Sequence, residues 1–281
     1  MEIHKPKPVH SWRELLTEIG VVVIGVSIAL AAEQTVEWLH WRTQVTEARK
    51  VLASEIAYNV RNAIWRMRTS TCVERRLDEL AAILDAAAKT GSLPAVGDIA
   101  TPARSYYLDG AWDSVVASQT ATHFPGQQLA NITLVYKVIT SQGARAVEEG
   151  AAWQSLYAMV GPGRRLDAAS EARLRESLSQ ARTLNRLAAA ASNFIAVRAN
   201  TLGLSFSAAD LALIAQGKHR PVQPTHDPNP TLLNTFATPF GAICAPIGGA
   251  PSLYGQGYYG AVPPLIDDAV KNLPDYAGGA P

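Results

Sequence analysis

The sequence predicts an all-α protein, with an N-terminal transmembrane helix that continues into an extracytoplasmic antiparallel helical bundle and a Pro/Gly-rich C-terminal strap. Three observations support this fold class. Residues 19–32 carry no charge, apolar residues recur at three- and four-residue steps through most of residues 42–217, and 11 of the 17 prolines lie in the last 63 residues. Alternating apolar and polar stretches are few, so we expect almost no sheet.

The uncharged run between Glu18 and Glu33 is too short to cross a membrane alone. Fourteen helical residues span about 21 Å, whereas the hydrocarbon core is ~30 Å thick. The membrane helix must therefore extend past both glutamates. Interface aromatics bound a longer helix at Trp12 on one side and at Trp38 and Trp41 on the other. We accordingly predict a short arm over residues 1–13 and a transmembrane helix over residues 14–41.

The glutamates and the small residues of this helix fall on one face. At about 100° per residue, five positions lie close together around the helix axis: Glu18, Val22, Gly25, Ala29 and Glu33. The spacing of Gly25 and Ala29 allows a second helix to approach closely. Carboxylates near hydrocarbon usually face protein or water. This face is predicted to contact another transmembrane helix, from a second copy or a partner subunit.

A cleaved signal peptide is the alternative to a membrane anchor. Lys5, Lys7 and Arg13 precede the apolar run, and Ala29-Leu30-Ala31 fits a signal-peptidase site. Cleavage after Ala31 would give a secreted periplasmic helical protein. The helical pattern continues beyond Ala31, which favours the anchor. Both interpretations remain open at this stage.

Localisation follows from the span and from the two cysteines. Lysines and arginines are balanced on the two sides of the helix, so their number does not set its orientation. We predict a single-pass protein of the bacterial inner membrane, with a cytoplasmic N-terminus and a periplasmic C-terminal domain. Cys72 and Cys244 form either one disulfide, which suits that compartment, or two unrelated buried thiols.

The segment from Glu18 to Gln34, with the tryptophan- and arginine-rich helix after it, resembles the N-terminal anchor of a bacterial family of uncharacterised single-span membrane proteins. The resemblance covers about the first 60 residues. That family has no assigned activity, so the resemblance implies an anchor and transfers no site residue.

The soluble part is predicted to form a helical bundle over residues 42–217 and a Pro/Gly/Tyr-rich extension over residues 218–281. Hydroxyl residues 69–71 are expected to interrupt the first helix, and Gly161-Pro162-Gly163 to break the chain. Gly217 is expected to end the last bundle helix. The expected helices are residues 42–67, 72–89, 111–118, 126–140, 144–160, 166–199 and 208–215, with a short candidate at 264–271.

The sequence contains no motif that names a reaction. Its net charge of +1 gives no basic face for nucleic acid. Gly255-x-Gly257-x-x-Gly260 lies among prolines rather than between a strand and a helix, and His219 and His226-Asp227 lack further ligands nearby. We therefore predict no cofactor, no metal and no enzyme activity. The pairs Glu148-Glu149 and Arg164-Arg165 are interpreted as helix-end or solvated charges, and Trp112, Trp153 and Tyr157 as core anchors.

The leading functional hypothesis is an accessory, assembly or scaffolding subunit of a membrane complex, which we expect to be an oligomer or part of a larger assembly. Its partners would be the lipid bilayer and another transmembrane helix. An alternative is an extracytoplasmic ligand sensor, because a helical bundle outside a membrane helix is a common arrangement for ligand recognition. The thirteen residues before the span hold no output domain, so such a sensor would need a partner.

Overall fold

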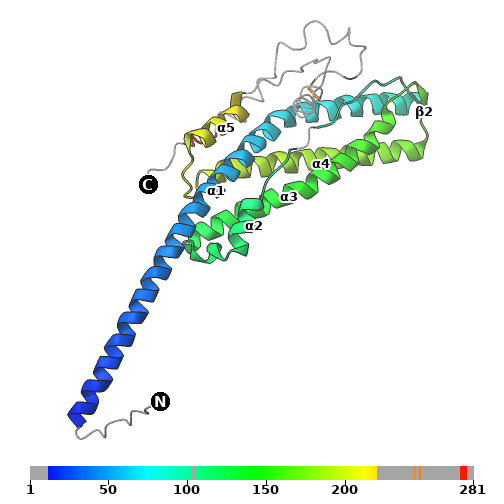
Figure 1. Cartoon of the computed structure of the whole chain (residues 1–281). Coiled ribbons are helices and arrows are strands. Elements are labelled where there is room, and N and C mark those ends of the chain that lie inside the picture. Colours follow the sequence, from blue (N-terminus) through cyan, green and yellow to red (C-terminus); the bar gives the residue numbers. More distant parts are fainter. Residues whose placement is uncertain (1–11, 103–104, 220–242, 245–246, 248–272, 277–281) are drawn as a thin grey trace, which may run out of the picture.

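The computed structural model describes residues 12–102, 105–219, 243–244, 247 and 273–276. In these residues the chain forms a helical bundle from which one long helix extends as a rod (Figure 1). The helices are α1 (Trp12–Thr90), α2 (Gly110–Ala117), α3 (Gly126–Leu156), α4 (Ala168–Ala199) and α5 (Ala208–His219), with short 3-10 turns η1 (Thr120–His123) and η2 (Tyr157–Met159). The all-α prediction is confirmed for the described part of the chain.

Helix α1 runs without a break, so the predicted interruption at residues 69–71 is wrong. The hydroxyl of Thr69 bonds back to the carbonyl oxygens of Trp65 and Arg66, both at 3.1 Å. The Ser70 hydroxyl instead donates to Asn185 on α4, at 3.2 Å. The Thr69 hydroxyl therefore bonds within the helix and the Ser70 hydroxyl bonds to α4, and neither bond interrupts α1. Cys72 lies inside α1 and does not begin a helix.

The two helices expected over 126–140 and 144–160 are a single helix, α3. Gly143 lies inside it, at a cost of about 1 kcal/mol relative to alanine. Packing against α4 outweighs that cost. Gln142 is buried at this level and donates from Nε2 to the Ala188 carbonyl oxygen at 3.2 Å.

The predicted break after α3 is confirmed. The chain leaves η2 and turns at Gly161, whose φ of +123° suits glycine. It then forms β2 (Arg164–Arg165), which pairs antiparallel with β1 (Ser92–Leu93). Helix α4 begins directly afterwards, because the Asp167 carboxylate caps it by accepting from the Ser170 N–H at 2.8 Å.

Buried apolar side chains form two clusters along α1. The cluster nearer the N-terminal end of α1 includes Leu52, Ile56, Ile64, Tyr136 and Ile195. The cluster farther from it includes Leu77, Leu84, Trp153, Leu156 and Leu178. Helices α1, α3 and α4 contribute to both, and Val45 is the first buried residue of α1. The bundle therefore begins about where the transmembrane prediction ends.

Helix α5 does not end at Gly217 as expected, because it continues to His219. This glycine is needed for packing. A Cβ at position 217 would lie 2.9 Å from the Arg61 carbonyl oxygen and 3.2 Å from its Cα, both backbone atoms of α1. The close approach also lets the Gly217 carbonyl oxygen accept from Arg68 Nη1 at 2.9 Å.

Gly217→Ala is therefore expected to lower the free energy of unfolding by about 1–3 kcal/mol, since backbone atoms must move to admit one methyl group. Chemical denaturation measures this change. Gly143→Ala is the matched control, because no atom lies within 4 Å of its Cβ position. That variant should raise the free energy of unfolding by up to about 1 kcal/mol. Equal behaviour of the two variants would contradict the packing role.

Parts of the C-terminal extension pack on the bundle. Ile243, Leu273 and Tyr276 are all buried. The Tyr276 hydroxyl donates to the Ala196 carbonyl oxygen on α4 at 2.6 Å, and burial raises the pKa of this phenol. The strap prediction holds at these residues. The candidate helix at 264–271 lies outside the described residues.

Candidate functional site

The predicted helix-helix face lies on the part of α1 that extends beyond the bundle (Figure 1). All five of its residues are exposed: Glu18, Val22, Gly25, Ala29 and Glu33. Val22 is 63% exposed, and no atom lies within 4 Å of the Cβ position of Gly25. This segment is the one described helix that is long and apolar enough to cross a membrane, and none of its most apolar window is buried. The face is thus available to a partner.

The three tryptophans predicted to lie at the membrane interface differ in their surroundings. Trp12 and Trp38 are 72% and 57% exposed. The Arg42 guanidinium lies over the Trp38 ring, 5.3 Å from its centroid. Trp41 instead stacks on His123 of η1, with ring centroids 3.9 Å apart. Trp41 therefore belongs to the lower edge of the bundle as well as to the predicted interface.

The structure joins Cys72 to Cys244 in a disulfide. Cys72 is buried in the second core cluster, and Ile243 is buried beside the bridge. Arg75 Nη2 donates to the Cys244 carbonyl oxygen at 2.6 Å. The bond links the C-terminal extension to the C-terminal third of α1.

The charges that follow Cys72 form a salt-bridged surface. On α4, Arg182 contacts Glu74 at 3.3 Å and Asp78 at 2.8 Å, and Arg186 contacts Glu74 at 3.3 Å. Arg76 differs, because it is buried and donates to the Ile99 carbonyl oxygen and to Glu79. The ion pairs of Arg182 and Arg186 with Glu74 and Asp78 hold α1 against α4.

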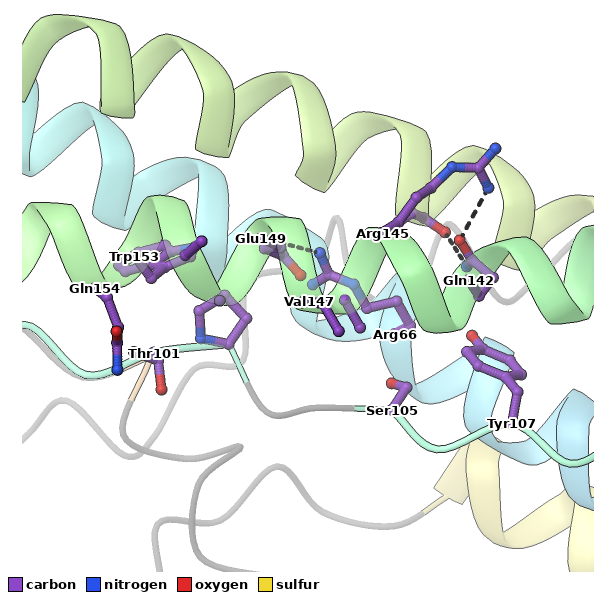
Figure 2. A pocket seen from close by; sticks show the side chains of 15 residues that line it. Arg66, Thr101, Ser105, Tyr107, Gln142, Arg145, Val147, Glu149, Trp153 and Gln154 are labelled. Carbon is purple, nitrogen blue, oxygen red and sulfur yellow. Dashed lines mark hydrogen bonds and ion pairs between the residues drawn. The ribbon is translucent and has the colours of Figure 1, made fainter.

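A cavity of about 530 Å³, lined by both polar and apolar side chains, lies where α1, α3, α4 and the segment after β1 meet. Figure 2 shows the segment with Thr101, Ser105 and Tyr107 running along α3, with Arg66 of α1 between them. Its lining residues include Arg66, Pro102, Ser105, Gln142, Arg145, Ala146, Val147, Glu149, Ala151 and Trp153. We call this space the Arg66 cavity. Its volume is within the usual range of small-molecule sites.

A buried ion pair forms one wall of the Arg66 cavity. Arg66 Nη2 donates to Glu149 Oε1 at 2.6 Å, and the two side chains are only 4% and 12% exposed. Burial raises the pKa of Glu149, and the Arg66 charge opposes that rise. Sequence interpretation placed Glu149 among solvated charges, which is wrong. The partner that makes its burial possible lies 83 residues away.

The cavity wall contains buried polar atoms that have no hydrogen-bond partner among the described residues: Arg66 Nη1, Ser105 Oγ and Trp153 Nε1. Arg145 donates to Gln142 Oε1 at 3.2 Å and forms no ion pair with the described residues. Arginine and tryptophan nitrogens can only donate. Native proteins leave few such buried groups unsatisfied, so these three mark the cavity as a candidate binding site.

The cavity was not predicted from the sequence, although the core-facing stripe of α3 contains polar residues that indicate it. Buried positions recur along α3 at steps of three, four or seven residues through Val135, Ile139, Gln142, Glu149 and Trp153, which keeps them on one face. Gln142 and Glu149 fall where that period calls for apolar residues. Polar side chains on a core-facing stripe indicate a buried polar network.

Within the described residues, no group of three or more His, Cys, Asp or Glu side chains is placed to hold a metal ion. Fold and site together describe a helical protein with one candidate membrane helix and a cavity in its bundle. No protein-family model, characterised protein or solved structure matches the chain. The exposed face of α1 and the Arg66 cavity are therefore the features that bear on function.

Proposed function

We propose that this protein is anchored in the bacterial inner membrane by α1 and acts by contact, as an accessory, assembly or scaffolding subunit of a membrane complex. Its N-terminus would be cytoplasmic and its bundle periplasmic. One observation supports this most strongly. Residues 16–40 of α1 are exposed almost throughout although they are mainly apolar, and an exposed apolar surface of this size needs lipid or protein to cover it.

The acidic face explains why lipid alone would be a poor environment for this helix. Glu18 and Glu33 would lie near the two edges of the hydrocarbon core, where a carboxylate is costly unless it meets water or protein. Gly25 and Ala29 lie between them on the same face and let a second backbone come close. A partner helix on this face would contact both small residues and shield both carboxylates.

Gly25→Leu with Ala29→Leu is expected to abolish self-association or partner capture, because two leucines prevent close approach of a second helix. The measurement is the size of the detergent-solubilised full chain, together with crosslinking in membranes. Gly20→Leu with Ala31→Leu is the matched control, since it makes the same two exchanges on the opposite face of α1. The control should keep the wild-type size and crosslinks.

Unchanged association in the Gly25 and Ala29 variant would overturn the contact proposal. Equal losses in both variants would show that bulk in the membrane, rather than this face, matters. An intact mass of the wild-type protein is measured first, because loss of residues 1–31 would establish a cleaved signal and remove the face altogether.

A ligand sensor is the second candidate, and the Arg66 cavity favours it. Arg66 lies on the same unbroken helix as the membrane segment. The distance along α1 from Arg66 to Glu33 is about 50 Å at 1.5 Å per residue. A change at the cavity could thus reach the membrane through one rigid element, with the output supplied by a partner.

A further inference from the structure

We propose that the Arg66 cavity binds a small organic monocarboxylate. This inference deepens the second candidate function, ligand sensing, and goes beyond the contact role. Three elements converge on the site: α1 supplies Arg66, α3 supplies Arg145 and Trp153, and the segment after β1 supplies Ser105 (Figure 2).

The unsatisfied donors call for an acceptor-rich ligand. Arg66 uses Nη2 for Glu149, while its Nη1 has no partner. The Ser105 hydroxyl is also buried without a partner and can donate. A carboxylate has two oxygens with about four acceptor positions, and its hydrogen bonds to guanidinium groups are among the strong ones. A ligand that only donates would leave all these groups unsatisfied.

The charges in the wall favour a monoanion. Among the described residues, the charged side chains that line the Arg66 cavity are the two cations Arg66 and Arg145 and the anion Glu149. The sum over these three side chains is one net positive charge, which one carboxylate neutralises. A dianion such as a phosphate monoester would bring a second negative charge beside Glu149, and the described part of the wall offers no third cation to balance it.

The remainder of the wall suits a hydrocarbon group. Pro102, Ala146, Val147 and Ala151 contribute apolar surface to the wall, and the volume of about 530 Å³ exceeds what a carboxylate alone would fill. Small-molecule sites typically combine an apolar wall with a few polar groups that fix orientation. The expected ligand thus has one carboxylate and an aliphatic or aromatic body.

Isothermal titration calorimetry on the detergent-solubilised full chain tests this with acetate, butyrate and phenylacetate as probes. Phenylacetamide and benzylphosphonate are the comparison ligands, because they keep the shape of phenylacetate and change its charge to neutral or to a dianion. We expect the carboxylates with a hydrocarbon body to bind and the amide to bind at least about 10-fold more weakly.

Two variants locate the binding. Arg145→Gln and Ser105→Ala are each expected to weaken phenylacetate binding, by on the order of 10-fold for the arginine. Ser105→Ala removes a buried hydroxyl that has no protein partner, so folding should not suffer. Arg165→Gln is the control, since this exposed arginine on β2 does not line the cavity. The Trp153 indole N–H resonance, assigned with Trp153→Phe, should shift on binding while that of Trp12 stays fixed.

If none of the three carboxylates binds at a concentration of roughly 20 mM, which would fill even a site with a millimolar Kd, the proposal is overturned. Tighter binding of benzylphosphonate would overturn the monoanion assignment, and equal binding by the wild-type, Arg145→Gln and Ser105→Ala proteins would place the ligand elsewhere. Binding that follows these expectations supports the site even if the chain signals nothing. Ligand binding without any change in partner crosslinking would sink the sensor function alone.

Discussion

Replacing Cys72 and Cys244 together by alanine is expected to lower the melting temperature by roughly 10–20 °C under oxidising conditions. The disulfide closes a loop with a sequence separation of 172 residues. In the chain-entropy model such a loop stabilises the folded state by about 5 kcal/mol, because the unfolded chain loses freedom when its ends are joined. The bond also fixes Ile243, whose side chain is buried in the second core cluster.

Circular dichroism during heating measures this effect, with reduced wild-type protein as the comparison. The reduced protein and the double variant should melt at similar temperatures, and the single variants should match them. Helix content at low temperature should stay near the wild-type level, since α1, α3 and α4 pack through apolar contacts that do not involve the bridge. A double variant that melts with the oxidised wild type would show that the bond does not constrain the unfolded chain.

Long periodic helices and their end signals could be predicted from the sequence, because both depend on residues close together in the chain. The helix over 166–199 needed only Asp167 as a cap and a repeating apolar stripe. The predicted breaks at residues 69–71 and 141–143 failed for a shared reason. Local preference for a break was weak there, and contacts with α4 from Ser70 and Gln142 favoured continuous helices.

The two sites differ in how far sequence interpretation could reach. The face with Gly25 and Ala29 could be predicted, because all its members lie on one helix at regular spacing. The Arg66 cavity could not, because it joins four segments whose approach depends on the bundle. Glu149 shows this most clearly: its position on the core-facing stripe of α3 indicates burial, but only the fold brings Arg66 to within 2.6 Å.

Glu149→Ala is expected to lower the free energy of unfolding by about 3–5 kcal/mol, because it leaves the Arg66 charge buried without its partner. Arg66 is 3% exposed, and its Nη1 already has no hydrogen-bond partner. Urea denaturation of the full chain in detergent measures the change. Glu148→Ala is the matched control, since this neighbouring glutamate is exposed and should change stability by no more than about 0.5 kcal/mol.

The double variant Arg66→Met with Glu149→Leu separates the cost of an unpaired buried charge from the net contribution of the ion pair to the free energy of unfolding. It should be near wild-type stability or above it, because two apolar side chains of similar volume avoid the desolvation of both ions. Burial raises the pKa of Glu149 above its usual 4.5. Protonation of Glu149 therefore stabilises the folded state fully below pH 4.5, and this stabilisation is lost as the pH rises through the raised pKa. Both variants should lack that loss. A double variant as unstable as Glu149→Ala would mean that the pair itself, rather than an orphaned arginine, stabilises the bundle.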